Sequence, residues 1–309
     1  MSEKLDRRTF LRKTLLSSTG VALGLGSIEQ RALLADANKP PQPTPPQPAP
    51  PTADKGMPMG KIGKLTVSKL ICGGNLISGH AHSRDLIYVS SLMRAYFTDD
   101  KIMETFQICE ENGINTAVLR TDKDTIRLLK KYWKERGGKI QWFAQTYPKP
   151  TNLKENIQMA IDNGAVAAFP QGMTGDKFYE EGHIDLLGQC IDFIKQNGLV
   201  AGIGSHSIDT PQGVVEAGIK VDFFMKTLNN VGYQCENPKQ VGEVMNKIKG
   251  KTPWIAYKVL GAGVTDPKDG FKYAFDMGAD FLTVGMYDFQ IKQDAMIVKE
   301  LLSREICKK

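Results

Sequence analysis

The sequence has few cysteines, and their spacing marks no common metal or redox motif. The five cysteines are odd in number and include no Cys-x-x-Cys pair, which excludes the usual zinc-ribbon and thioredoxin-type patterns. Cys72, Cys109 and Cys190 lie within apolar segments, where a free cysteine packs like a small apolar side chain. We therefore expect buried thiols rather than disulfides or metal ligands.

The sequence also lacks a long apolar run and a strong excess of one charge. The apolar, glycine-rich stretch at residues 15–28 is shorter than the ~20 residues that span a bilayer, so we expect no stable membrane span. The net charge is +6 over 309 residues, and no basic cluster alternates with aromatic residues, so nucleic acid is not an expected partner. No Gly-x-Gly-x-x-Gly motif follows the first predicted strand, which disfavours a doubly wound dinucleotide-binding sheet.

The first 58 residues have a composition that predicts targeting and spacing rather than a folded domain. Arg7 and Arg8 precede the mildly apolar stretch, a pattern that resembles a twin-arginine signal peptide over residues 1–37. This signal implies the Tat export machinery as a partner and a periplasmic or secreted protein. A basic amphipathic N-terminus and a retained anchor remain open. Residues 38–58 are rich in proline, which fixes φ and removes hydrogen-bond donors, so they predict a disordered, extended tether.

From residue 59 to residue 309, short apolar runs alternate with longer amphipathic segments. The predicted strands are residues 68–73, 115–119, 140–146, 165–169, 200–204, 221–225, 254–259 and 280–284. The predicted helices are residues 101–112, 124–136, 153–163, 184–197, 211–217, 239–249, 268–277 and 291–302. Strict alternation of eight strands with eight helices predicts an α/β protein with a closed parallel barrel, the (β/α)8 or TIM barrel. An open doubly wound sheet is the alternative.

Polar residues recur where the apolar strands end. Catalytic groups of such barrels lie at the carboxyl ends of the strands, because parallel strands bring all these ends to one rim. The candidates at this rim are Asn75, His80, His82, Arg120, Gln145, Gln171, Asp176, His206, Lys226, Lys258, Tyr287 and Asp288. We predict catalytic roles for His82, His206, Lys226 and Lys258, and substrate binding by Asn75, Arg120, Gln145 and Gln171.

Three of the four histidines fall at this rim and suggest a metal site. His80 and His82 are two residues apart, so an extended segment would point both side chains the same way. His206 follows the fifth predicted strand, and neutral imidazoles bind zinc and similar ions. A metal-dependent hydrolase, lyase or isomerase with these three ligands is therefore one hypothesis, with Asp176 or Asp288 to position or deprotonate a water. Loop histidines that face solvent or hydrogen-bond a substrate are the alternative.

Lys226 and Lys258 each end an apolar strand, where an ammonium is costly to bury unless an opposite charge lies nearby. Three arrangements satisfy this requirement: an anionic small-molecule ligand, an ion pair with Asp or Glu, or mutual repulsion that lowers one pKa and yields an amine nucleophile. Arg120 adds a third cation to the rim. The expected partner is therefore a small polar or anionic molecule, with Asp176 and Asp288 as competing charges. A non-catalytic periplasmic barrel that only binds such a ligand satisfies the same electrostatics.

Several segments resemble the aldo/keto reductase family, over residues 59–303 and in the family's order. They are residues 59–70 with 72–75, 110–115, 201–207, 255–264, and 284–286 with 291–294. The resemblance implies a TIM barrel with a short N-terminal hairpin, an oxidoreductase activity and NADP as cofactor. It also implies that Gly285 and Lys292 belong to the segment that holds the NADP phosphate.

The family's proton-donating tetrad is missing from the matching positions. The family carries Asp and then Tyr after strand two, Lys on strand three and His on strand four. Here those positions fall in residues 115–120, which hold no Asp and have no nearby Tyr, at Gln145, and in residues 169–171. A carbonyl reduction needs a proton donor besides the hydride. The sequence therefore predicts a divergent aldo/keto reductase-like oxidoreductase of the cell envelope that acts on or binds a small polar or anionic molecule.

Overall fold

The computed structural model describes residues 56–80, 82 and 86–306. The predicted signal peptide and all but the end of the predicted tether lie outside these residues, as does Cys307. No helix in the described part of the chain is long and apolar enough to cross a membrane.

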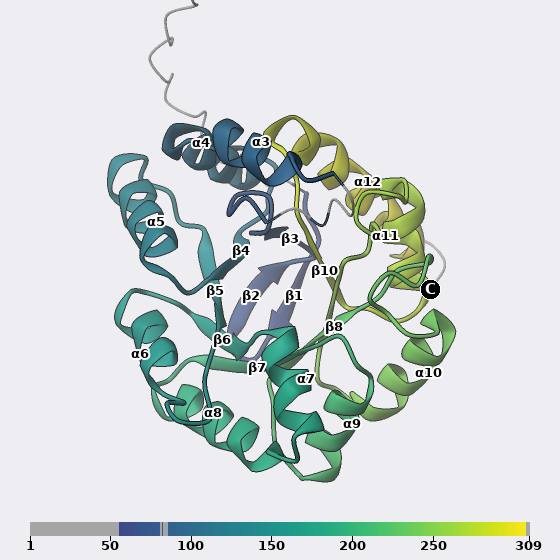
Figure 1. Ribbon diagram of the computed structural model, residues 1–309. Coiled ribbons are helices and arrows are strands. Elements are labelled where there is room, and N and C mark those ends of the chain that lie inside the picture. The colour runs from purple at the N-terminus through teal and green to yellow at the C-terminus, as the bar shows by residue number, and fades with distance from the viewer. Residues whose placement is uncertain (1–55, 81, 83–85, 307–309) are drawn as a thin grey trace, which may run out of the picture. The chain divides into compact units, whose positions relative to one another are not determined.

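Eight parallel strands form a closed barrel, as the sequence predicts (Figure 1). They are β3 (Leu70–Gly73), β4 (Thr116–Arg120), β5 (Gln141–Thr146), β6 (Ala167–Pro170), β7 (Val200–Ser205), β8 (Phe223–Thr227), β9 (Trp254–Tyr257) and β10 (Phe281–Val284). Pairing of β10 with β3, in which Leu282 lies opposite Leu70, closes the ring. The predicted strands agree with these bounds to within two residues at each end, and the (β/α)8 prediction is confirmed.

The eight predicted helices surround the strands. They are α4 (Asp99–Glu111), α5 (Lys123–Glu135), α6 (Glu155–Asp162), α8 (Ile184–Gln196), α9 (Asp209–Glu216), α10 (Pro238–Ile248), α11 (Pro267–Asp276) and α12 (Asp288–Ile306). Two further helices, α3 (Val89–Tyr96) and α7 (Gly172–Glu180), do not follow from the sequence pattern. Helix α7 contains Gly172 and Gly175, and glycine disfavours helix, so this segment has no local signal for a helix.

A β-hairpin precedes the barrel, as the resemblance implied. Strands β1 (Met59–Ile62) and β2 (Leu65–Ser68) pair antiparallel, with Met59 opposite Ser68. Gly63 makes the tight turn with φ +54°, a conformation that favours glycine. Ile62 and Val67 of the hairpin are fully buried in the same apolar cluster as the barrel interior. The hairpin therefore packs onto the strands, and it appears within the ring of helices in Figure 1.

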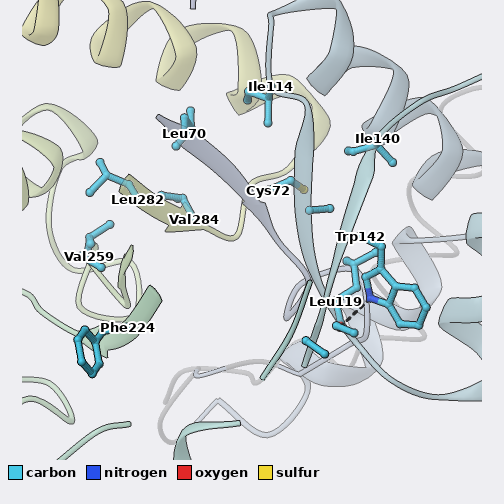
Figure 2. Packing of buried hydrophobic residues seen from close by; sticks show 14 of the residues in the cluster. Leu70, Cys72, Ile114, Leu119, Ile140, Trp142, Phe224, Val259, Leu282 and Val284 are labelled. Atoms are coloured by element: carbon cyan, nitrogen blue, oxygen red, sulfur yellow. Dashed lines mark hydrogen bonds between the residues drawn. The ribbon is translucent and has the colours of Figure 1, made fainter. Parts of the chain in front are cut away.

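The strands bury side chains on both faces and so divide the core into two layers. Phe143, Phe169, Phe223 and Ile255 belong to the interior cluster. The residues that alternate with them pack between strands and helices, where the Trp142 indole donates a 3.1 Å hydrogen bond to the Leu119 carbonyl (Figure 2). Because successive strand residues point to opposite faces, this alternation decides which strand-end side chains reach the mouth of the barrel. The four described cysteines, Cys72, Cys109, Cys190 and Cys235, are buried and free, as expected.

Candidate active site at the mouth of the barrel

The carboxyl ends of the strands open into a cavity of about 1290 Å³. This volume suits a small molecule or a cofactor. Most of the predicted site residues line the cavity, namely Asn75, His80, His82, Arg120, Gln145, Gln171, Asp176, His206, Lys258, Gly285 and Tyr287. Lys226, Asp288 and Lys292 are not among the lining residues. The closed barrel therefore brings strand-end residues that are far apart in the sequence to one cavity, as the prediction of a single polar rim requires.

A carboxylate–imidazole pair forms one side of the cavity. Asp176 Oδ2 accepts hydrogen bonds from the His206 backbone N–H at 2.7 Å and from its Nδ1 at 3.0 Å. Asp176 Oδ1 accepts from the Thr210 hydroxyl at 2.8 Å and the Ser207 N–H at 3.3 Å. An ionised carboxylate only accepts hydrogen bonds, so the proton of a neutral His206 ring lies on Nδ1. The other nitrogen, Nε2, is then left with a free lone pair, which makes His206 a candidate proton acceptor.

Close packing of α7 on β7 brings this pair together. A Cβ atom on Gly175 would lie 2.2 Å from the Gly204 carbonyl oxygen, which belongs to the backbone of β7. A Cβ atom on Gly172 would lie 2.5 Å from the Tyr257 hydroxyl and 2.6 Å from the His206 ring. Any larger residue at these positions would push the helix outward. Gly172 and Gly175 weaken the local sequence signal for helix α7, and the same two glycines allow the close packing through which Asp176 reaches His206.

Lys258 lies at the rim directly after β9. Its Nζ is 3.0 Å from His82 Nε2, and 5.8 and 5.9 Å from the ring centres of Tyr233 and Tyr257. Burial lowers the pKa of Lys258 to about 8. No Asp or Glu within the described ranges forms an ion pair with it. This arrangement agrees with the predicted position of Lys258 at the mouth.

Both predicted loop histidines lie in a cationic part of the rim. Burial lowers the pKa of His82 to about 4, with smaller contributions from Lys258 and His206. Its Nε2 is 3.0 Å from Asn75 Nδ2 as well as from Lys258 Nζ, so it accepts from neighbouring donors. The pKa of His80 is also lowered, first by burial and then by Arg120 and Arg94. Both imidazoles are therefore neutral at pH 7.

Lys226 requires a correction to the sequence-based prediction. On β8, Phe223 and Met225 face the interior, so Lys226 points to the helix side together with Phe224. Its fully buried ammonium donates to the His206 carbonyl at 2.5 Å and forms an ion pair with Glu236 at 3.2 Å. The ion-pair arrangement that was one of the three sequence-level alternatives thus applies to Lys226. It supports the backbone of His206 and does not face a ligand.

The metal hypothesis is also not supported. Within residues 56–80, 82 and 86–306, no three His, Cys, Asp or Glu side chains gather closely enough to hold a metal ion. His206 Nδ1 is occupied by Asp176, and His82 Nε2 faces the Lys258 ammonium, which repels a cation. Asp288 lies outside the cavity and accepts hydrogen bonds from Tyr96 at 2.5 Å and Lys101 at 3.0 Å. The residues proposed as ligands therefore serve other contacts.

The predicted substrate-binding residues point into the mouth, in agreement with strand alternation. Arg120 follows Val118 on the interior face of β4, and its guanidinium lies 4.8 Å from the Tyr147 ring centre and 3.3 Å from Asp122 Oδ2. The guanidinium Nε makes this contact with Asp122, so the two terminal NH2 groups of Arg120 can donate to an anionic group. Gln145 is the second-last residue of β5. Gln171 directly follows β6 and also caps α7, because its side chain accepts a hydrogen bond from the Met173 N–H at 3.0 Å.

The segment that resembles a nucleotide site fits NADP only in part. Gly285 lines the cavity, and its backbone approaches Gly73 closely, since a Cβ on Gly73 would lie 2.8 Å from Gly285 N. Lys292 instead is exposed on α12 and is not part of the cavity wall. Asp294, two residues on, is buried, and burial together with nearby Asp266 raises its pKa to about 6. Asp294 places an acidic side chain on the same helix as Lys292, which does not suit a 2′-phosphate.

Sequence reasoning missed several residues that the fold brings to the mouth. Tyr257 lines the cavity from the interior face of β9 and donates its hydroxyl to the Ser205 carbonyl at 2.9 Å. Its ring centre lies 5.6 Å from that of His206. The Thr283 hydroxyl is buried in the cavity wall with no hydrogen-bond partner among the described residues. Both residues could have been found by extending the interior-face alternation of β9 and β10 to the strand ends.

Comparisons with known proteins agree on the fold. No family model matches the chain, and no curated protein matches its sequence. An aldo-keto reductase from Bacillus halodurans in its holo form is similar in structure, with 12% identity, a TM-score of 0.56, and coverage of 80% of this chain and 96% of that chain. Phospho-2-dehydro-3-deoxyheptonate aldolase from Thermotoga maritima has 9% identity and a TM-score of 0.51, covering 80% of this chain and 74% of that chain. At such low identity these likenesses show a shared barrel fold alone.

Proposed function

We propose that this chain is a divergent, aldo/keto reductase-like enzyme that binds a small anionic carbonyl compound in the barrel mouth and transfers a proton through His206. The Asp176–His206 pair carries this proposal, because it holds one imidazole nitrogen protonated and leaves the other as an acceptor. Arg120 supplies donors for the anionic group from across the same cavity. A purely structural barrel has no need of a carboxylate-oriented histidine at this position.

A titration of anionic carbonyl compounds tests this function. We expect pyruvate, glyoxylate or 2-oxoglutarate to bind in isothermal calorimetry, and Arg120→Gln to weaken binding by about tenfold, the loss of ~1.4 kcal/mol from a charge-assisted contact. Arg127→Gln is the matched control, because Arg127 lies on α5 in an exposed ion pair with Asp99. His206→Gln should keep binding but slow deuterium exchange of the bound pyruvate methyl group by ~10²–10⁴-fold. Absence of binding by all three compounds would contradict the proposal, and binding without exchange would leave a non-catalytic ligand-binding barrel.

A nicotinamide-dependent oxidoreductase is the second candidate. It is favoured by the aldo-keto reductase fold likeness and by Gly285 in the cavity wall. The nucleotide, when bound, would supply a hydride, and His206 Nε2 would pass a proton taken from solvent to the substrate oxygen. Titration with NADPH in the same calorimeter distinguishes this candidate from a hydride-independent enzyme.

We propose further that the protein acts in the cell envelope, reached through the twin-arginine route. Support comes from Arg7 and Arg8 before a mild apolar stretch, followed by a proline-rich tether. Replacing both arginines with lysine should leave the protein in the cytoplasm, because the Tat signal depends on the paired arginines. Cell fractionation measures this, and unchanged export of the double variant would remove the proposal.

A further inference from the structure

Lys226 and Lys258 both end barrel strands, but their ammonium groups lie in different surroundings. Lys226 is fully buried and paired with Glu236 at 3.2 Å. Around Lys258, the carboxylates that share the cavity wall are Asp176, Glu180 and Glu236, and none lies within 4.0 Å of its Nζ. Lys258 is thus a cationic group in the cavity whose charge no protein carboxylate neutralises among the described residues.

The backbone at Lys258 is what turns its side chain into the cavity. On β9, Ile255 and Tyr257 face the interior, so regular alternation would send Lys258 to the helix side, as happens to Lys226. Lys258 instead has φ +58°, a left-handed conformation that is strained for a residue other than glycine. Its carbonyl accepts from the Gly261 N–H at 2.9 Å, which closes the turn. Strain of this kind persists where the surrounding structure enforces it, often at functional sites.

The close neighbours of the Lys258 amine do not neutralise its charge. His82 Nε2, at 3.0 Å, is neutral at pH 7 and accepts a hydrogen bond from the amine. The remaining close groups are the phenol rings of Tyr233 and Tyr257. Burial favours the uncharged amine, which is the nucleophilic form of lysine.

We infer that Lys258 forms a covalent imine with the carbonyl compound that binds in the mouth. In this step the neutral Nζ attacks the carbonyl carbon and forms an N–C bond, the carbonyl π electrons move to oxygen, and one Nζ proton passes through solvent to that oxygen to give the carbinolamine. His206 Nε2, after taking a proton from solvent, gives it to the carbinolamine oxygen; the C–O bond breaks, the oxygen leaves as water, and the nitrogen lone pair forms the C=N bond. The second Nζ proton returns to solvent, so the sum is amine plus carbonyl giving imine plus water. The step consumes only amine and carbonyl and needs no oxidant or reductant. The inference rests on the proposed function and names its substrate class as a ketone or aldehyde with an anionic group.

Borohydride trapping tests the imine. The full chain is incubated with glyoxylate or pyruvate, treated with sodium borohydride, and analysed by intact mass and peptide mapping. We expect one reduced adduct, on Lys258, which Lys258→Met abolishes. Lys134→Met, at an exposed lysine in the last turn of α5, is the matched control and should retain the adduct.

A second measurement does not depend on the choice of carbonyl compound. Trace acetylation with acetic anhydride at a series of pH values reports how readily each amine reacts. Labelling of Lys258 should rise with a midpoint near pH 8, well below the ordinary lysine pKa of about 10.4, and Lys134 is followed in the same samples as the reference amine. No adduct on Lys258 with either compound, adducts spread over surface lysines, or a Lys258 midpoint equal to that of Lys134 would each overturn the inference.

The failure of this inference is distinguishable from the failure of the proposed function. If calorimetry shows anion binding that depends on Arg120 but no adduct forms, the imine is wrong and the non-covalent proton-transfer function stands. If the carbonyl compounds neither bind nor react, both are wrong. The Lys258→Met variant must also keep the far-ultraviolet circular dichroism and the unfolding midpoint of the unaltered protein for its loss of adduct to support the imine.

Discussion

Replacing Lys226 with methionine is expected to lower the free energy of unfolding by about 2–3 kcal/mol without weakening ligand binding. The fully buried ammonium donates to the His206 carbonyl, the Thr227 hydroxyl at 3.0 Å and Glu236. Breaking a buried ion pair typically costs ~3–5 kcal/mol. The Glu236 side chain is 39% exposed and can be hydrated after the change, so the expected loss lies below that range.

Urea denaturation followed by circular dichroism measures the Lys226 effect. The double variant Lys226→Met with Glu236→Gln should recover part of the loss, because it removes the unpaired carboxylate as well as the ammonium. Pyruvate affinity of folded Lys226→Met serves as the functional readout. A stable variant that binds pyruvate more weakly would indicate that Lys226 contacts the ligand, which would contradict its position on the helix side of β8.

Replacing Asp176 with alanine is expected to cost about 3–5 kcal/mol and to release the His206 ring. Four donors lose their acceptor: two backbone N–H groups, the Thr210 hydroxyl and the His206 Nδ1–H. A buried donor left without a partner costs ~1–3 kcal/mol, and water entering the cavity satisfies some of the four. For a domain of this size, each 1 kcal/mol corresponds to ~2–4 °C in the unfolding temperature.

Asp176→Asn separates the structural effect from the effect on the imidazole. Its amide oxygen can still accept from the backbone, so we expect a smaller loss of stability than for alanine. The His206 ring should lose its fixed Nδ1–H form, which nitrogen-15 NMR of the imidazole detects, and methyl-proton exchange of bound pyruvate should fall with it. An unchanged tautomer in Asp176→Asn would contradict the role assigned to this carboxylate.

Two of the positions that match the family's proton-donating tetrad line the cavity in this structure. The matching positions hold Gln145 and Gln171, and both side chains line the cavity without acidic protons to give. The two groups to which the proposed chemistry is assigned lie on other strands, with His206 after β7 and Lys258 after β9. The proton-transfer chemistry proposed for this barrel is therefore placed on other strands than in the family that it resembles.

The barrel itself could be predicted because its determinants are local. Each strand is a short apolar run, each helix has its own amphipathic pattern, and the ends of the apolar runs placed Arg120, Gln145 and His206 at the rim. Parallel strands then require all their carboxyl ends to meet at one rim. These statements need only sequence spacing, and the structure agrees with them.

The chemistry of the mouth depended on contacts between distant segments. Lys226 and Lys258 look equivalent in sequence, but a left-handed φ turns only Lys258 into the cavity, and Glu236 neutralises only Lys226. Helix α7 has no helical signal, because the glycines that weaken it locally are those that fit against β7 and bring Asp176 to His206. Side-chain periodicity fixes direction within a regular strand, whereas charge pairing and close backbone approach are set by which segments the closed barrel brings together.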